Sequence, residues 1–240
     1  MYKTLREKVF SQLREKFQEQ RVDLFMTLMK PQDGISVLDL GGEWGDFLAR
    51  IKNRLQAKFV IADIREDYRL TVEQKYGFEF VLIDEEKPLP FKDKAFDVII
   101  SNSVIEHVTL PKEVCLTNIP QTEWASSSMQ RQRQFATEIR RVSKSYFVQT
   151  PHRSFPIETH TWLPFVNFLN HNRATSLVRF TDKYWIKHCG YVDWNLLSPV
   201  EMKDLFPDAE LYIERCLGFP KSIIAYYTEQ NSAGSRHAAP

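Results

Sequence analysis

The chain has 240 residues, of which 43% are hydrophobic and 26% are charged, and its formal net charge is +1 at pH 7. This composition is ordinary for a soluble globular protein, and it allows a core large enough to fold without disulfide bonds or structural metals. The near-neutral charge argues against binding of a phosphate backbone as the main task, so no nucleic acid is expected as a partner.

The three cysteines, Cys115, Cys189 and Cys216, lie far apart and form no Cys-x-x-Cys pair. We therefore expect neither a disulfide framework nor a metal site, and we expect a reducing compartment such as the cytoplasm. The longest apolar runs are far too short to cross a membrane, and the charged N-terminus has no apolar signal core. The sequence predicts no membrane insertion and leaves the oligomeric state open.

Hydrophobic periodicity predicts the elements of the first 150 residues. Apolar residues at four-residue steps predict a helix from residue 3 to about residue 30, within an N-terminal segment 1–32. Short apolar runs predict strands at 35–40, 58–62, 78–83, 95–100 and 146–149. Between them, helical spacing of apolar residues predicts helices at 44–55, 68–76 and 129–141. Segment 109–128 contains two prolines and a run of three serines, and is expected to be a loop insertion.

Strands and helices alternate over residues 33–150, and the strands are apolar nearly throughout. Strands of this kind are covered on both faces. The predicted fold class is therefore α/β, with a doubly wound, mostly parallel, Rossmann-like sheet and right-handed crossovers. Residues 33–150 are the expected ligand-binding core.

The pattern changes after residue 150. Residues 151–207 are rich in aromatic residues, histidine and proline, and we expect them to form a helical and aromatic cap over a ligand site. Within this cap, the sequence predicts a helix at 181–189 and a strand-like segment at 191–197. Ser198-Pro199-Val200-Glu201 is a helix start, because a serine cap and a glutamate three residues later can form a capping box.

Two apolar runs within residues 208–229 flank Gly218 and predict a terminal antiparallel hairpin. This hairpin is expected to complete a seven-stranded sheet. Residues 230–240 are small and polar, and they are expected to form a disordered tail.

Polar or glycine residues follow four of the predicted strands, and ligands of open α/β sheets bind outside the carboxyl ends of the strands. These residues are Gly41, Gly42 and Gly45 after the first strand, Asp63 after the second, Asp84 after the third, and Ser101 and Asn102 after the fourth. Asp63 lies 18 residues after Gly45, near the interval of about 20 at which an acidic residue reaches the hydroxyls of a ribose. The sequence therefore predicts a nucleoside site at this edge of the sheet.

The first glycine turn reads Gly41-Gly42-Glu43-Trp44-Gly45 and lacks the G-x-G-x-x-G pattern of dinucleotide sites. A carboxylate at Glu43 would repel a pyrophosphate, whereas it suits a cationic or amino-bearing ligand. An NAD(P)-dependent oxidoreductase is therefore an alternative that the turn disfavours.

Three segments resemble a known family. Val37–Gly45 resembles the first motif of class I S-adenosylmethionine-dependent methyltransferases. Leu89–Ile99 with Ser101–Val108 is similar to a later motif of the small-molecule, methyltransferase type 11-like branch. Phe147–His160 looks like a subgroup of bacterial methyltransferases, many of them linked to glycan or secondary-metabolite pathways. The departure is Glu43, where the usual motif has a glycine.

The resemblance implies S-adenosylmethionine as the cofactor and S-adenosylhomocysteine as its product. It also implies the cofactor-binding residues: Gly41, Gly42 and Gly45 at the methionine end, Asp63 at the ribose, Ile64 and Asp84 at the adenine, Ser101, Asn102 and Ser103 under the sulfonium, and Asp39 at the loop or the amino group.

A hydroxyl acceptor needs a base, and histidine titrates near neutrality. The candidate catalytic residues are His107 after the fourth strand and His152 and His160 after the fifth, whereas Glu106 is expected to be a solvated or capping residue. The expected reaction is O-methylation of a small molecule such as a sugar, a glycan or a secondary metabolite. The alternatives are N-methylation of a small molecule and a non-catalytic cofactor-binding module that acts through a partner protein. A nucleic-acid methyltransferase is disfavoured, because no Asn-Pro-Pro-Tyr-like motif follows the fourth strand.

The family resemblance and the oxidoreductase alternative predict different ligands. S-adenosylhomocysteine should raise the melting temperature of the chain, because a ligand that binds only the folded state stabilises that state. NAD at the same concentration should leave the melting temperature unchanged. Thermal unfolding with each ligand measures both effects, and a shift with NAD alone would favour the oxidoreductase.

Overall fold

The structure is a computed structural model that describes residues 2–184 and 190–229. Seven strands form one sheet in the order β3-β2-β1-β4-β5-β7-β6. The strands are β1 (Ser36–Leu40), β2 (Lys58–Asp63), β3 (Glu79–Leu82), β4 (Phe96–Asn102), β5 (Ser143–Pro151), β6 (Glu210–Cys216) and β7 (Phe219–Tyr227). The predicted fold class is confirmed: the sheet is Rossmann-like and mostly parallel, and it ends in an antiparallel hairpin.

The chain divides into two compact units, of which the first comprises Met1–Ile100, Ser143–Phe147 and Thr228–Pro240. In this unit β1 pairs in parallel with β2 and with β4, and β2 pairs in parallel with β3. Leu40 lies opposite Ala62, and Asp63 lies opposite Leu82. The carboxyl ends of the three strands are therefore in step, which brings the residues after them to one edge.

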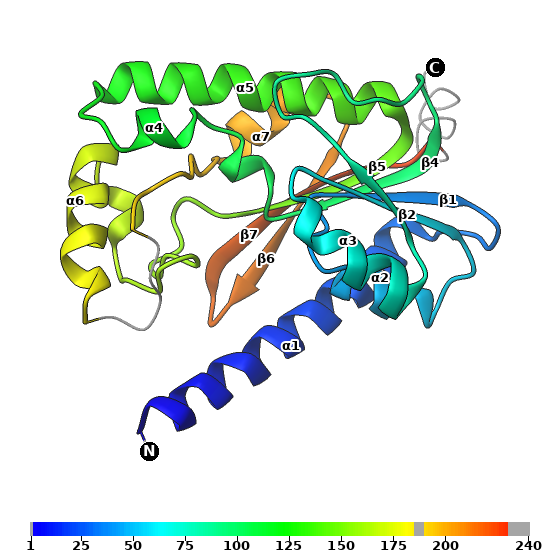
Figure 1. Ribbon diagram of the computed structural model, residues 1–240, viewed down its shortest axis with the longest axis horizontal. Coiled ribbons are helices and arrows are strands. Elements are labelled where there is room, and N and C mark those ends of the chain that lie inside the picture. Colours follow the sequence, from blue (N-terminus) through cyan, green and yellow to red (C-terminus); the bar gives the residue numbers. More distant parts are fainter. Residues whose placement is uncertain (1, 185–189, 230–240) are drawn as a thin grey trace, which may run out of the picture. The chain divides into compact units, whose positions relative to one another are not determined.

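The helices of the first unit are α1 (Tyr2–Met29), α2 (Asp46–Lys52) and α3 (Arg69–Thr71). The predicted N-terminal helix is confirmed, and it packs on α2 (Figure 1). Arg50 of α2 forms an ion pair with Glu19, and the ring of Phe25 lies edge-on to Phe147 with centroids 5.5 Å apart. Both contacts come from the second half of α1, and they hold that half against its neighbours.

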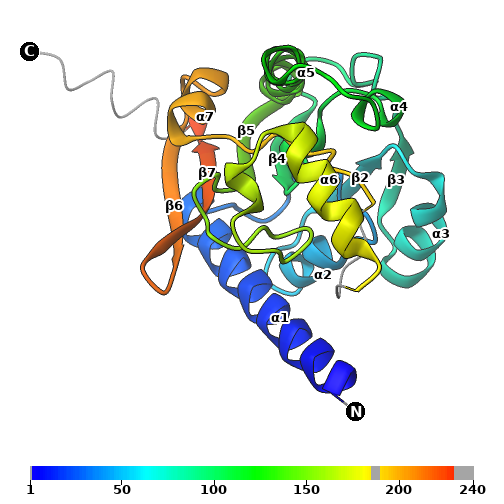
Figure 2. The same ribbon diagram turned by 90° about the vertical axis from the view of Figure 1, so that its left-hand side faces the viewer.

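The second unit comprises Ser101–Val142 and Val148–Tyr227. Its helices are α4 (Lys112–Cys115), α5 (Gln121–Val142), α6 (His171–Asp182) and α7 (Pro199–Leu205). Helix α5 contacts α6 and α7, and α7 lies against β7 (Figure 2). Strands β6 and β7 pair in antiparallel register, with Ile213 opposite Ile223, so the predicted hairpin is confirmed.

The loop predicted at 109–128 is wrong. Helix α4 lies within it, and α5 begins at Gln121 rather than at residue 129. The first half of α5 buries Trp124, Ser128 and Gln132. Two of these residues are polar, so the apolar period that marks an amphipathic helix is interrupted. Polar residues on the buried face are the reason that the pattern concealed the start of the helix.

Two predictions for the cap segment also differ from the structure. Helix α6 covers His171–Asp182 and so begins ten residues before the predicted helix 181–189, of which residues 185–189 are not described. Asn170 caps α6 by accepting a hydrogen bond from the amide of Arg173 (3.0 Å). Residues 191–197 form no strand. The buried side chain of Trp194 belongs to an apolar cluster that includes Ala174 and Val178 of α6. The apolar residues of this segment therefore pack against a helix and not within a sheet. Residues 185–189 and the predicted tail 230–240 lie outside the described residues.

Among the helices that the structure describes, none has the length and apolar character needed to cross a membrane.

The capping box predicted at Ser198 is present. Ser198 Oγ accepts a hydrogen bond from the Glu201 amide (3.3 Å), and the Glu201 carboxylate accepts one from the Ser198 amide (2.7 Å). Ser198→Ala should lower the free energy of unfolding by about 1 kcal/mol, because it leaves amides of the first turn of α7 unpaired. Urea unfolding measures the change. Ser198→Asn is the matched control, since asparagine keeps a capping oxygen, and an equal loss in both variants would contradict the assignment.

Candidate functional site

The glycine turn after β1 is tied to the end of β2 by Asp63. Asp63 Oδ2 accepts a hydrogen bond from the Glu43 amide (3.1 Å), and Oδ1 accepts one from the Arg65 amide (3.0 Å). The Gly41 amide donates to the Ala62 carbonyl (2.8 Å). Burial, the largest influence, raises the pKa of Asp63 although these amide hydrogen bonds oppose the rise. Asp63 therefore fixes the turn and retains lone pairs that can accept from hydroxyl groups.

Two glycines of this turn have no room for a side chain. A Cβ on Gly45, whose φ is +81°, would lie 2.9 Å from Ile61 Cδ1, and a Cβ on Gly42 would lie 2.7 Å from the Asp39 carboxyl group. Glu43 has a φ of 46°, a left-handed conformation that costs a residue with a side chain about 1 kcal/mol or more. The backbone at Glu43 thus keeps the glycine-like conformation although the side chain departs from the motif.

Asp39 is a buried carboxyl group that lacks a full set of partners. It is 2% exposed, and its Oδ2 has no hydrogen-bond partner among the described residues. Burial, and then the charges of Asp63 and Glu43, raise the pKa of Asp39 to about 8. A cationic amino group of a ligand would satisfy this oxygen and would favour the ionised carboxylate.

Asp84 and Ile64 lie at the same edge but are exposed. The Ile83 amide donates to the Asp63 carbonyl (3.0 Å), so Asp84 follows directly after the paired ends of β2 and β3. Its carboxylate pairs with Lys87 (2.6 Å), and this contact is the main reason that its pKa is lowered. Ile64 is 53% exposed, which leaves an apolar surface free to pack against a flat ligand.

The residues after β4 belong to the second unit. Ser101 is buried, and both polar atoms of the Asn102 side chain are buried without a hydrogen-bond partner among the described residues. Ser103 is held by Gln149, which accepts hydrogen bonds from its amide (2.9 Å) and from its hydroxyl (3.0 Å). The Asn102 amide is thus a second polar group that is suited to a ligand.

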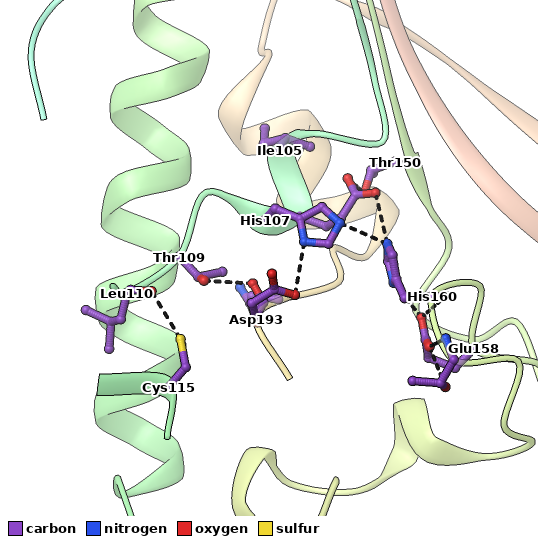
Figure 3. Close-up of polar contacts among 12 residues, drawn as sticks. Ile105, His107, Thr109, Leu110, Cys115, Thr150, Glu158, His160 and Asp193 are labelled. Atoms are coloured by element: carbon purple, nitrogen blue, oxygen red, sulfur yellow. Dashed lines mark hydrogen bonds and ion pairs between the residues drawn. The ribbon is translucent and has the colours of Figure 1, made fainter. Parts of the chain in front are cut away.

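Two of the three candidate histidines meet in the second unit (Figure 3). His107 Nε2 lies 3.0 Å from His160 Nε2, and their rings are nearly perpendicular. On the outer sides of the pair, His107 Nδ1 lies 3.1 Å from Asp193 Oδ1, and His160 Nδ1 lies 2.5 Å from Glu158 Oε1. Figure 3 shows the four side chains in a row, with a carboxylate at each end.

The Glu158 carboxylate is oriented by hydrogen bonds in addition to its contact with His160. It is fully buried, and it accepts hydrogen bonds from the amides of His160 (2.8 Å) and Thr161 (2.5 Å) and from the Thr161 hydroxyl (2.7 Å). Burial alone would raise the pKa of Glu158, but the contact with His160 and the amide hydrogen bonds lower it overall. An ionised Glu158 holds the proton of the His160 ring at Nδ1.

Asp193 and His107 stabilise each other's charged forms. Desolvation, the largest influence on the His107 ring, lowers its pKa, but the hydrogen bond with Asp193 and the charge of Glu106 raise the pKa overall. Burial likewise opposes ionisation of Asp193, and the contact with His107 lowers the pKa of its carboxyl group overall. Asp193 therefore keeps a proton on Nδ1 of His107.

Glu106 is not a solvated residue, in contrast to the prediction. It is fully buried, and its Oε2 accepts a hydrogen bond from the Thr150 hydroxyl (3.0 Å). Its Oε1 has no hydrogen-bond partner among the described residues and lies 3.8 Å from His160 Nε2. Sequence reasoning also missed Glu158 and Asp193. One feature of the sequence could have indicated Glu158, because it lies two residues before the candidate base His160.

His152 is not joined to this pair. Its amide donates to the Lys221 carbonyl (2.8 Å), and its Nδ1 accepts a hydrogen bond from the Ser154 amide (3.0 Å). Burial, and then the charges of Arg153 and Arg215, lower the pKa of His152. The contacts of His152 are those of a residue that shapes the turn after β5.

Comparison with known proteins agrees with this geometry. Residues 37–121 match the sequence model of a family described as a methyltransferase domain. Over these residues the chain resembles a methyltransferase domain. No curated protein matches the chain in sequence.

Several solved structures share the fold of this chain. Magnesium protoporphyrin IX methyltransferase from Synechocystis PCC 6803, solved with bound SAH, is 14% identical, with a TM-score of 0.52 over 89% of this chain and 82% of that chain. The PH0226 protein from Pyrococcus horikoshii OT3 is 19% identical, with a TM-score of 0.54 over 88% and 90% of the two chains. Mycolic acid cyclopropane synthase CmaA1, complexed with SAH and CTAB, is 16% identical, with a TM-score of 0.54 over 84% and 63%.

The raised pKa of Asp39 makes the stability of the ligand-free chain depend on pH. The folded state keeps this proton up to about pH 8, whereas the unfolded chain releases it near the ordinary value of 3.8. The contribution of Asp39 to the free energy of unfolding should therefore fall from about pH 4 to about pH 8, at up to about 1.4 kcal/mol per pH unit. Asp39→Asn should remove this decline.

The measurement is urea unfolding of both proteins at several pH values between 5 and 8. Asp84→Asn is the control, because the exposed Asp84 carboxyl group has a lowered pKa and cannot produce a loss of this sign. Parallel curves for wild type and Asp39→Asn would contradict the assignment.

Proposed function

We propose that this methyltransferase binds S-adenosylmethionine at the tips of β1, β2 and β3 and methylates a hydroxyl group of a small molecule, such as a sugar, a glycan or a secondary metabolite. The observation that carries the choice of a hydroxyl is the His107–His160 pair with its flanking carboxylates. An amine that is already nucleophilic needs no such group, whereas a hydroxyl must lose its proton.

The residues after the first three strands have the chemistry that this cofactor requires. Asp63 keeps acceptor capacity for the two ribose hydroxyls, and the exposed Ile64 offers an apolar contact for adenine. Asp84 is the proposed partner of the adenine amino group. The unpartnered Asp39 oxygen suits the cationic amino group at the methionine end. Gly41, Gly42 and Gly45 complete the proposed cradle.

When bound, S-adenosylmethionine supplies an electrophilic methyl group on a sulfonium. The chain's own residues must then orient the acceptor, exclude water and remove a proton. Ser101, Asn102 and Ser103 are the proposed floor beneath the methyl donor, and the buried Asn102 amide supports this role.

We assign activation of the acceptor hydroxyl to His107 and His160. Each ring has a carboxylate at Nδ1, so we assign acceptance of the hydroxyl proton to Nε2, which in each ring lies 3.0 Å from Nε2 of the other. The third predicted base, His152, is assigned a positioning role, because its Nδ1 is engaged by the Ser154 amide. Residues 151–207 are the proposed acceptor cap, and Trp194, stacked on the His160 ring at 4.8 Å, belongs to it.

The acceptor is accessible to direct measurement. Mass spectrometry of small-molecule extracts, incubated with the enzyme and S-adenosylmethionine, should reveal a compound that gains one methyl group on oxygen. Methylation on nitrogen would replace the proposal with the N-methyltransferase alternative. Bound cofactor without any methylated compound, together with a stable partner protein, would favour the non-catalytic module.

Removal of either ring of the pair should lower kcat without weakening the cofactor site. His107→Ala and His160→Ala should each reduce kcat by about 100-fold or more, the usual contribution of a positioned base. The dissociation constant of S-adenosylhomocysteine, measured by calorimetry, should stay close to that of wild type. Glu113→Gln, an exposed carboxylate on α4, is the matched control and should leave kcat unchanged. Full turnover by both histidine variants would contradict the assignment.

A further inference from the structure

We propose that His107, His160 and Glu106 form a binding site for one divalent transition-metal cation. Each of the three side chains offers one ligand atom, and these atoms lie within 4.8 Å of one another. They come from two segments, the turn after β4 and the loop after β5, so the fold has brought them together from distant parts of the sequence. The expected absence of a metal site rested on the cysteines, and none of these ligands is a cysteine.

The first argument concerns the space between the imidazoles. Asp193 and Glu158 each bind an Nδ1, and a carboxylate accepts only from a protonated nitrogen. Both neutral rings therefore carry their proton on Nδ1 and a lone pair on Nε2. The two Nε2 atoms are only 3.0 Å apart. Two lone pairs at this distance repel, so the pair needs a positive species, which is either a proton shared between the two nitrogens or a metal cation bound to both of them.

The second argument concerns Glu106. Its side chain is fully buried, and its Oε1 has no hydrogen-bond partner among the described residues. An ionised carboxylate in such a place is costly unless it is paired or binds a metal. A proton shared by the two imidazoles would leave this oxygen 3.8 Å from the nearest ring nitrogen. A cation beside the rings can bind all three atoms, and it would satisfy the oxygen that a proton leaves unpaired.

The distances indicate the coordination geometry. If a cation lay about 2.1 Å from each imidazole nitrogen, the nitrogen–cation–nitrogen angle would be about 90°, because the two nitrogens are 3.0 Å apart. This angle is that of adjacent ligands of a six-coordinate ion rather than of a tetrahedral one. Two imidazoles and one carboxylate form a set that holds first-row divalent cations such as Fe²⁺, Mn²⁺ and Co²⁺ with positions left open. Ca²⁺ and Mg²⁺ prefer ligands that are all oxygen atoms, so this set, with two nitrogens, does not suit them.

The groups behind the ligands are those of a metal site. Imidazole ligands usually donate their second ring nitrogen to a carboxylate or carbonyl, which fixes the tautomer and the orientation of the ring. Both rings here have such a carboxylate. Glu158 is fixed by Thr161, and the backbone carbonyl of Asp193 accepts a hydrogen bond from the Thr109 hydroxyl (2.8 Å). Three carboxylates, Glu106, Glu158 and Asp193, thus surround two imidazoles, and a divalent cation offsets part of this negative charge.

The catalytic role of the cation rests on the proposed function, whereas the binding of the cation can be tested without it. A cation with open positions can bind the acceptor hydroxyl and lower its pKa. The two imidazoles would then hold the cation instead of taking the proton themselves. The hydroxyl acceptor and the residues that activate it stay the same in either form of the site.

Binding of Co²⁺ and Mn²⁺ to the full chain tests the proposal without any methyl transfer. After dialysis against a chelator, the protein should bind one Co²⁺ per chain by calorimetry, with visible absorption bands of a six-coordinate ion. Glu106→Gln, His107→Gln and His160→Ala should each weaken binding by at least about tenfold. Asp193→Asn, which changes only a residue behind a ligand, should weaken it by about 10–100-fold. Glu113→Gln is the matched surface control and should bind like wild type.

The outcomes separate this inference from the proposed function. Absence of Co²⁺ and Mn²⁺ binding, or binding that the ligand variants leave unchanged, overturns the metal site and leaves proton transfer to the imidazoles as the role of the pair. Thermal unfolding of each variant checks that it folds. His107→Gln keeps the test valid if substitution of the more buried His160 destabilises the chain. Metal binding without methylation of any hydroxyl would instead contradict the proposed function.

Discussion

Burial of carboxylates is the constraint on which both parts of the site depend. Asp39, Asp63, Glu106 and Glu158 are each 5% exposed or less, and an ionised carboxylate buried without partners costs several kcal/mol. Asp63 and Glu158 meet this cost with backbone amides, which also fix the loops that supply them. Asp39 and Glu106 each retain an oxygen without a partner. The first pair therefore fixes loops of the candidate site, and the second pair offers the two oxygens that we propose as contacts for bound ligands.

The fold was predictable because its signals are local. A strand such as 58–63 is apolar along its length and ends in a polar residue, and both features lie within six residues of the chain. The start of α5 was not predictable in this way. Gln132 is buried there because its side-chain amide donates to the carbonyls of Ile105 and Asn195, both at 2.9 Å. These partners are distant in the sequence, so no local pattern records that a glutamine belongs on the inner face.

The candidate site also has one part that local sequence signals indicated and one part that depends on contacts between distant residues. Most of the proposed cofactor residues directly follow strands, so their spacing indicated them, whereas Asp39, Ile64 and Ser103 were indicated only by the family resemblance; Glu43 has a left-handed backbone. The proposed activating group is assembled from residues near 106, 158 and 193 of the chain. The sequence indicated the histidines by residue type, but it did not indicate which two meet. It also did not indicate the carboxylates, because only the fold determines which acidic side chains are buried.

The division of the chain into two units has a consequence for how new specificities arise. The backbone crosses between the units four times, near residues 100, 142, 147 and 227, and β4 and β5 each begin in one unit and end in the other. A break after Ile100 would separate Asp39 and Asp63 from the histidines, but it would cut β4 and leave two segments of the first unit, Ser143–Phe147 and Thr228–Pro240, on the other side. Exchange of either unit as a whole therefore requires several junctions, and a single crossover cannot transfer the second unit intact.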